Sequence, residues 1–237
     1  MRNLSPASGF TCLSSFRKNV CSDFPAHPIF SGPARPVEKR FDVFTTLAAH
    51  LLFWVCAKMR YMSDDEKLEI VDEQGNPLGI VTREEAERKN HITQNVLVFV
   101  FTQEGKIWAQ KRPLSKKHYP GLWDISACGG IVFGEMPNLS ALRETQEEMG
   151  ITCELHFVDK FLNQFKGEDG SKRQRFSHLF VGITDQEPIV SPEVDEFKCL
   201  TYDELKEKIK SHPEHFVPSF LLELEKAYTA SKKMSWF

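Results

Sequence analysis

Three glutamates, Glu144, Glu147 and Glu148, are spaced so that their carboxylates would converge on one face of a helix. Residues three and four positions apart are neighbours on a helix surface, and like charges at that spacing repel one another. A solvated surface tolerates this repulsion, whereas a bound cation between the carboxylates would relieve it. Clustered carboxylate oxygens are the donors that Mg²⁺ or Mn²⁺ prefers. The spacing therefore indicates either an ordinary acidic surface or a divalent-metal site.

The segment around these glutamates predicts a helix from about Pro137 to Met149. Proline suits the first helical turn, and Gly150 suits the left-handed position just past the end. One side of this helix is predicted to face the core. That side consists of Leu139, Leu142 and Met149, with Ala141 and Thr145 beside them.

A longer pattern contains the glutamates. Five residues separate Gly129 from Glu135, and seven more separate Glu135 from the stretch RETQEEMGI at 143–151. This resembles the Nudix box, Gly-x5-Glu-x7-Arg-Glu-U-x-Glu-Glu-x-Gly-U, where U is a bulky apolar residue. Eight of the nine specified positions match. The exception is Thr145, where the family usually has an aliphatic residue, and we expect it to soften one core contact without affecting the chemistry.

The resemblance implies a Nudix fold, an α/β fold with a mixed β-sheet sandwiched between α-helices (α/β/α). It also implies cleavage or rearrangement of a diphosphate linked to another moiety. By the family's pattern, Glu147 and Glu148 would be the main metal ligands, Glu144 a further ligand or the base that activates water, and the Gly129 carbonyl an additional ligand. The implied cofactor is Mg²⁺ (or Mn²⁺), since such ions neutralise charge on phosphate oxygens and activate water.

Other residues receive supporting or substrate-binding roles in this interpretation. Arg143 would act in catalysis by orienting one of the glutamates through a charge-assisted hydrogen bond. The supporting residues would be Glu135, Gly130 and Gly150. The substrate-binding candidates are basic side chains that flank the site in sequence, namely Arg112, Lys111 and Lys117. Arg112 is favoured because a guanidinium binds phosphate bidentately, although a solvated loop is the alternative.

Over roughly residues 65–230 the chain is also similar to type I isopentenyl-diphosphate isomerase, a Nudix-fold enzyme. The isomerase has a Trp, a catalytic Cys and a Gly-His-Pro whose histidine binds metal. Trp123 and Cys128 match this region, but Gly130 stands in place of the histidine. The strand at 173–184 contains no glutamate for the second catalytic carboxylate of the isomerase, and the roles of its Arg175 and His178 stay open.

A proton-shuttling isomerase needs an acid and a base on opposite faces of the alkene. We therefore favour a Mg-dependent Nudix pyrophosphohydrolase that cleaves the diphosphate linkage of a nucleoside diphosphate derivative or a related small diphosphate. Isopentenyl-diphosphate delta-isomerase is the alternative, and Cys128 is then catalytic rather than a packed thiol. A non-catalytic nucleotide-sensing module is a second alternative, but such modules usually lose box glutamates, and this chain keeps all of them.

The domain interpretation places an N-terminal extension, disordered or non-native, at 1–62 and a Nudix hydrolase domain at 63–237, with its core at about 92–212. The Ser/Arg-rich, acid-poor composition at 1–60 also partly matches an organelle transit peptide. The apolar run at 43–57 is shorter than the roughly 20 residues of a spanning helix.

Charge and cysteine usage limit the partners. Residues 1–62 carry eight Lys/Arg and three Asp/Glu, and residues 63–237 carry 22 and 30. An acidic domain argues against nucleic-acid binding by bulk charge. None of the six cysteines has CxxC spacing, which indicates reduced thiols. We expect a cytoplasmic enzyme with a small-molecule diphosphate substrate, no nucleic-acid or membrane partner, and monomer or homodimer as assembly states.

The remaining elements follow from turn signals and periodicity. A Thr82 cap with Glu85 three residues later predicts a short helix. The other predicted elements are two strands within 67–82, a hairpin at 95–112, strands at 153–165 and 173–184, and helices at 202–211 and 218–233.

Overall fold

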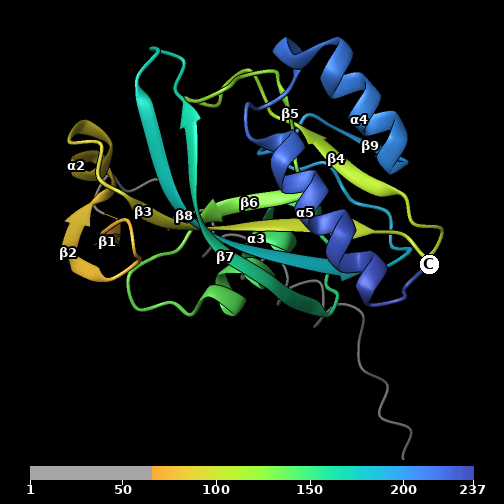
Figure 1. Ribbon diagram of the computed structural model, residues 1–237, viewed down its shortest axis with the longest axis horizontal. Coiled ribbons are helices and arrows are strands. Elements are labelled where there is room, and N and C mark those ends of the chain that lie inside the picture. The colour runs from red at the N-terminus through yellow and green to blue at the C-terminus, as the bar shows by residue number, and fades with distance from the viewer. Residues whose placement is uncertain (1–65) are drawn as a thin grey trace, which may run out of the picture. The chain divides into compact units, whose positions relative to one another are not determined.

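The computed structural model describes residues 66–237, and these form a mixed β-sheet with helices on both of its faces (Figure 1). This confirms the predicted α/β/α class. The strands are β1 (Lys67–Val71), β2 (Pro77–Thr82), β3 (Thr93–Phe101), β4 (Ile107–Lys111), β5 (Trp123–Asp124), β6 (Ala127–Gly130), β7 (Leu155–Lys166), β8 (Lys172–Ile183) and β9 (Glu196–Leu200). The helices are α2 (Arg83–Arg88), α3 (Pro137–Met149), α4 (Tyr202–Ser211) and α5 (Phe220–Lys233), with a 3-10 turn at Pro213–His215.

Strand β3 is the centre of the sheet. It pairs in parallel with β8 over its whole length and antiparallel with β6, while β1 and β4 meet its two ends. Its sequence TQNVLVFVF is apolar at successive positions, as expected for a strand that is covered on both faces. The strand therefore supplies side chains to two separate cores.

The two cores lie on opposite faces of the sheet. Val96, Val98 and Val100 pack with Ala141 and Met149 of α3. The intervening β3 residues pack against α4 and α5, and this core contains Leu97, Phe99, Phe101, Leu205, Ile209, Phe220 and Leu224. Alternation along one strand thus fixes the helix that carries the glutamates on one face and the two closing helices on the other.

Helix α3 begins and ends where the sequence predicts, and Gly150 ends it with φ at 68°. The predicted core-facing stripe is only partly right, because Leu139 and Leu142 are 51% and 38% exposed. Ala141, Thr145 and Met149 are buried as predicted, and Ser140, Glu144 and Glu148 are buried with them. The Thr145 hydroxyl donates to the Ala141 carbonyl at 2.7 Å, so this polar side chain is satisfied within the core.

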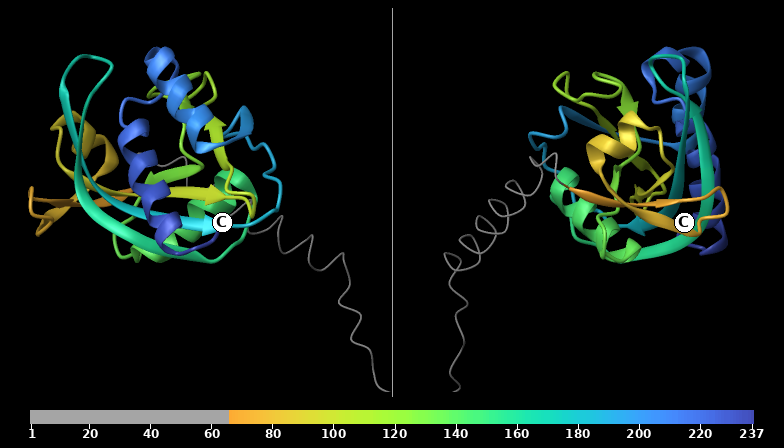
Figure 2. Two further views of the ribbon diagram at one scale, coloured as in Figure 1. Left: turned by 45° about the vertical axis from the view of Figure 1, so that its right-hand side comes forward. Right: turned by 90° about the vertical axis from the view of Figure 1, so that its left-hand side faces the viewer.

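The other predicted elements are present, and the Thr82 hydroxyl accepts from the Glu85 amide as expected for a helix cap. The short strands β5, β6 and β9 were not predicted. Strands β7 and β8 form a long twisted hairpin whose tip extends beyond the sheet (Figures 1 and 2). The loop after β4 meets this tip, where the Tyr119 hydroxyl donates to the Lys166 carbonyl at 3.1 Å. This loop and the hairpin tip form two walls of the cavity described below.

The predicted extension at 1–62 and the apolar run at 43–57 lie outside the described residues. Three of the cysteines, Cys12, Cys21 and Cys56, lie there as well. In the described part, Cys128, Cys153 and Cys199 are free thiols. No helix within residues 66–237 is both long enough and apolar enough to cross a membrane.

Candidate active site

Arg143 lies at the centre of the carboxylate cluster on α3. Its Nε donates to Glu135 at 3.0 Å, and Nη1 donates to Glu144 at 2.7 Å and to Glu147 at 3.1 Å. Its Nη2 donates to the Gly130 carbonyl at 3.2 Å. One planar guanidinium thus positions three carboxylates and the strand end before the helix, which is a broader role than the predicted orientation of one glutamate.

Glu148 is held separately from that network. Its Oε2 accepts from Gln110 Nε2 at 2.7 Å and from the Cys128 amide at 2.9 Å. The first donor comes from β4 and the second from β6, so two strands fix this carboxylate against the sheet.

Glycine at position 129 is explained by the close approach of Glu144. A Cβ built on Gly129 would lie 2.0 Å from the Glu144 carboxyl carbon, closer than any real contact. The carboxylate therefore packs directly on the β6 backbone, next to the Gly129 carbonyl that the family pattern proposes as a ligand.

Burial raises the pKa of the three box glutamates. For Glu144 the pKa rises well above its usual value despite the opposing charge of Arg143, and for Glu148 it rises to about 7. For Glu147 the pKa also rises, mainly through burial. Burial also acts on Glu135, but hydrogen bonds from Arg143 and Ser140 outweigh it and lower the pKa of that carboxyl.

These pKa directions show that burial disfavours the charged carboxylates by more than Arg143 and the other donors stabilise them. Such a site gains stability from an additional cation, and its donors are all oxygen atoms. Hard oxygen donors suit Mg²⁺ or Mn²⁺. The residues present therefore fit the divalent ion that the family resemblance implies.

Replacing Arg143 with lysine is expected to lower the free energy of unfolding by about 1–3 kcal/mol, because lysine keeps the charge but cannot replace the several hydrogen bonds of the guanidinium. Urea unfolding in metal-free buffer measures this loss. Arg88→Lys on the short helix α2 is the matched control and should change little. An equal effect of the two substitutions would contradict the central role of Arg143.

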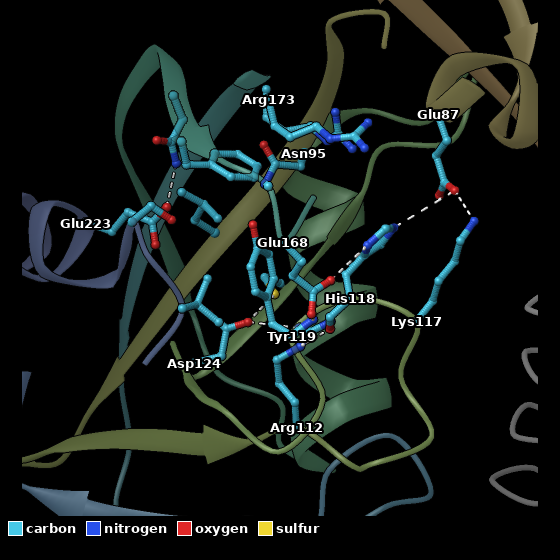
Figure 3. Close-up of a pocket in the computed structure, with 18 of the residues that line it drawn as sticks. Glu87, Asn95, Arg112, Lys117, His118, Tyr119, Asp124, Glu168, Arg173 and Glu223 are labelled. Atoms are coloured by element: carbon cyan, nitrogen blue, oxygen red, sulfur yellow. Dashed lines mark hydrogen bonds and ion pairs between the residues drawn. The ribbon is translucent and has the colours of Figure 1, made fainter. Parts of the chain in front are cut away.

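On the other side of β6 lies a cavity of about 410 Å³ (Figure 3). Its walls come from β3, β6, the β7–β8 hairpin, the loop after β4 and the start of α5. Cys128 connects it to the carboxylate cluster, because its amide binds Glu148 while its side chain lines the cavity. The cavity and the carboxylate cluster are therefore neighbours, and Cys128 is the residue that contacts both.

Two of the three predicted substrate-binding cations line this cavity. Arg112 Nη1 pairs with Asp124 at 2.9 Å, and Lys117 pairs with Glu87 (Figure 3). Lys111 is not among the lining residues, and its Nζ lies 6.0 Å from the centre of the Trp123 ring. The structure thus brings Arg112 and Lys117 to one cavity and leaves Lys111 outside it.

Several lining residues were not singled out from the sequence as site residues. These are Arg173 on β8, Asn163 on β7 and Glu223 on α5, whereas Arg175 of β8, which also lines the cavity, is a residue whose role the sequence left open. Glu223 and Asn163 are only 2% and 3% exposed. Their positions in the helix and the strand follow the spacing of ordinary core residues. The one available signal in the sequence was therefore a charged or amide side chain at a position where the periodicity predicts burial.

The two positions that differ from the isomerase pattern have other neighbours here. A Cβ at Gly130 would lie 3.0 Å from Nη2 at the end of the Arg83 side chain, whose Nε donates to Glu66 at 2.6 Å. The strand after the box presents Arg173 and Arg175 to the cavity, where the isomerase pattern requires a carboxylate. His178 lies elsewhere, with Nε2 2.9 Å from Gln94 Oε1.

The chain belongs to the Nudix family, because the model of the NUDIX domain matches residues 91–220. The solved structure of DR0079 from Deinococcus radiodurans has the same fold, with a TM-score of 0.59 at 22% identity. That match covers 69% of this chain and 99% of the other.

Within the family, the chain is related to proteins named isopentenyl-diphosphate Delta-isomerase. It is 32% identical over 157 residues to such a protein of Photorhabdus laumondii, covering 66% of this chain and 89% of that one. It is 32% identical over 173 residues to one of Streptomyces griseus, covering 71% and 86%. An uncharacterized Nudix hydrolase of Pseudomonas aeruginosa is 41% identical over 92 residues, covering 39% and 54%.

Proposed function

We propose that this Nudix protein is a Mg²⁺-dependent hydrolase of a small diphosphate, such as a nucleoside diphosphate derivative. The observation that carries the proposal is the carboxylate cluster, which Arg143, Gln110 and the Cys128 amide hold, next to a cavity that has arginines on β8. Gly130 stands where the isomerase pattern has its metal-binding histidine. The cluster provides metal ligands, and the arginines favour an anionic substrate.

In this proposal Glu144, Glu147 and Glu148, with the Gly129 carbonyl, hold the metal. When bound, the metal supplies positive charge to the diphosphate oxygens and polarises the attacking water. Water attacks one phosphorus, the bond from that phosphorus to the bridging oxygen breaks, and the water proton passes to a carboxylate. Glu144 and Glu147 are candidates for the base, because Arg143 holds both in place. Arg112 and Lys117 would contact the substrate's phosphate groups.

Isopentenyl-diphosphate isomerisation is the second candidate, and the names of the relatives favour it over hydrolysis. One feature of the cavity also supports it. Burial, with the nearby Asp124 and Glu148, raises the pKa of the Cys128 thiol well above its usual value. Its Sγ lies 3.6 Å from Asp124 Oδ2. A protonated thiol beside a carboxylate is a group that can donate a proton to an alkene.

A product screen separates the candidates. The full chain would be incubated with Mg²⁺ and either nucleotide diphosphate derivatives or isopentenyl diphosphate, and products would be identified by mass and NMR. Hydrolysis that stops with EDTA supports the first candidate. Dimethylallyl diphosphate without phosphate release supports the second. Absence of both reactions would favour a nucleotide-sensing module instead.

Cys128→Ala distinguishes the two reactions within one protein. The hydrolase needs no thiol, so kcat for diphosphate hydrolysis should stay within about threefold of the wild type. An isomerase would lose essentially all activity, because a general acid contributes about 10²–10⁴-fold. Cys199→Ala, at another partly buried thiol of the described domain, is the control. Loss of hydrolysis in the Cys128 variant alone would contradict a hydrolytic mechanism that needs no thiol.

A further inference from the structure

Asn163 and Glu223 form a buried polar pair on the wall of the cavity. Asn163 Nδ2 donates to Glu223 Oε1 at 2.6 Å, a bond that joins β7 to α5 (Figure 3). The Ser219 side chain also hydrogen-bonds to this carboxyl from the residue just before α5. The pair lies outside the Nudix box and is not used by the proposed hydrolysis.

The pair has hydrogen-bonding capacity that the protein leaves unused. Asn163 Oδ1 is buried and has no hydrogen-bond partner among the described residues. A buried polar atom without a partner is costly, and such atoms are rare in folded proteins. Both residues line the cavity, so a small rotation of the Asn163 amide would bring the free atom to a ligand there.

We propose that Asn163 and Glu223 determine substrate specificity by binding the adjacent hydrogen-bond donor and acceptor on the edge of a nucleobase. This deepens the proposed function, since it identifies the group that is attached to the diphosphate. Asn163 would accept from the donor of that edge, and Glu223 would donate to its acceptor.

The electrostatic surroundings of Glu223 agree with the donor role. Burial is the main cause that raises its pKa to about 7, and the charge of Asp124 from β5 raises it further. The cavity also contains other ionisable residues, namely Glu87, Arg112, Lys117, His118, Tyr119, Cys128, Glu168, Asp169, Arg173 and Arg175. Arg112 is paired with Asp124, so it gives Glu223 no ion pair. Below about pH 7 the carboxyl therefore carries a proton that it can donate.

The rest of the cavity is compatible with a nucleotide. Leu97, Phe165 and Val217 are apolar lining residues against which a flat base can pack. Arg175 Nη1 donates only to the Gln174 carbonyl, at 3.0 Å, and the described residues give it no salt bridge. Its charge is thus available to an anion. A hydrocarbon chain would cover the Asn163 oxygen without bonding to it.

Binding can be measured without catalysis by calorimetry on the full chain, using CMP, UMP, AMP, GMP and ribose 5-phosphate. Ribose 5-phosphate has the sugar and phosphate but no base. We expect at least one nucleotide to bind the wild type tenfold or more tightly than ribose 5-phosphate at pH 6. Asn163→Leu should remove this preference while leaving ribose 5-phosphate binding unchanged. Asn76→Leu at an exposed turn is the control.

The pH profile identifies the donor. The ratio of nucleotide to ribose 5-phosphate affinity should fall in the wild type as pH rises through about 7, because ionised Glu223 cannot donate. Glu223→Gln keeps a donor at every pH, so its ratio should stay flat. Glu225→Gln, at an exposed position of the same helix, should keep the wild-type profile. Circular dichroism confirms that each variant is folded.

The outcomes separate this inference from the proposed hydrolysis. Equal binding of all nucleotides and ribose 5-phosphate overturns the inference, even if the protein hydrolyses another diphosphate. A base preference that survives Asn163→Leu, or a pH profile unchanged by Glu223→Gln, overturns it as well. Base-dependent binding without turnover supports the inference and contradicts hydrolysis. If hydrolysis occurs, Asn163→Leu and Glu223→Gln should each raise KM for the preferred nucleotide with little change in kcat.

Discussion

Glu148→Gln should lower kcat by at least about 100-fold, since even partners of metal ligands cost 10–100-fold when removed. The amide retains one oxygen for the Cys128 N–H but loses the negative charge that holds a divalent ion. Steady-state hydrolysis across a Mg²⁺ titration measures the effect. Glu154→Gln, whose carboxylate is exposed on the same domain, should behave as the wild type.

The same substitution should not destabilise the fold in metal-free buffer. The folded-state pKa of Glu148 is raised to about 7, so the unfolded chain ionises first as pH rises above the usual value of 4.5. Stability from this group is therefore highest at low pH and falls between pH 4.5 and 7. A glutamine side chain does not titrate. The free energy of unfolding of Glu148→Gln should therefore exceed that of the wild type by the largest amount above pH 7. Wild-type turnover in Glu148→Gln would contradict the metal-ligand assignment.

Gly129→Ala should nearly abolish activity and lower the free energy of unfolding by about 1–3 kcal/mol, as overpacking does. The added methyl group would occupy the space of the Glu144 carboxylate, which must then leave the cluster. Thermal unfolding and kcat at saturating Mg²⁺ measure the two effects.

A double-mutant cycle tests whether Glu144 is the cause. In a Glu144→Ala background the obstructing carboxylate is gone, so Gly129→Ala should cost little further stability. An undiminished cost in that background would mean that Gly129 is required by its backbone conformation instead. Gly129 has no positive φ, which favours the steric explanation.

The sequence was sufficient to predict the family and the longer helices and strands, but not the short strands β5, β6 and β9. The Nudix box has fixed spacing, and the bounds of α3 follow from Pro137 and Gly150, whose backbone preferences are strong. Burial was harder to predict. Leu139 and Leu142 are apolar yet exposed, because α3 turns Glu144 toward Gly129, which admits a close approach, and Glu148 toward the Cys128 amide. Helical periodicity alone does not reveal which face of a helix can pack against a neighbouring strand.

The cavity could not be predicted, because it depends on contacts between distant segments. Asn163 and Glu223 are 60 positions apart in sequence and meet only when α5 packs over β7 and β8. Arg112 was predicted from its basic neighbourhood, but its pairing with Asp124 depends on the loop that folds back after β4. Site residues outside a motif thus become visible only with the tertiary structure.

The parallel pairing of β3 with β8 has a consequence for synthesis of the chain. The pairing joins Thr93 to Arg175 and continues to Phe101 and Ile183, so the central strand waits about 80 residues for its partner. During translation, β3 would emerge with one edge open and both apolar faces uncovered. Such a strand is prone to aggregation until β8 arrives. We therefore expect folding of this domain on the ribosome to begin late, with the nascent chain depending on chaperones until then.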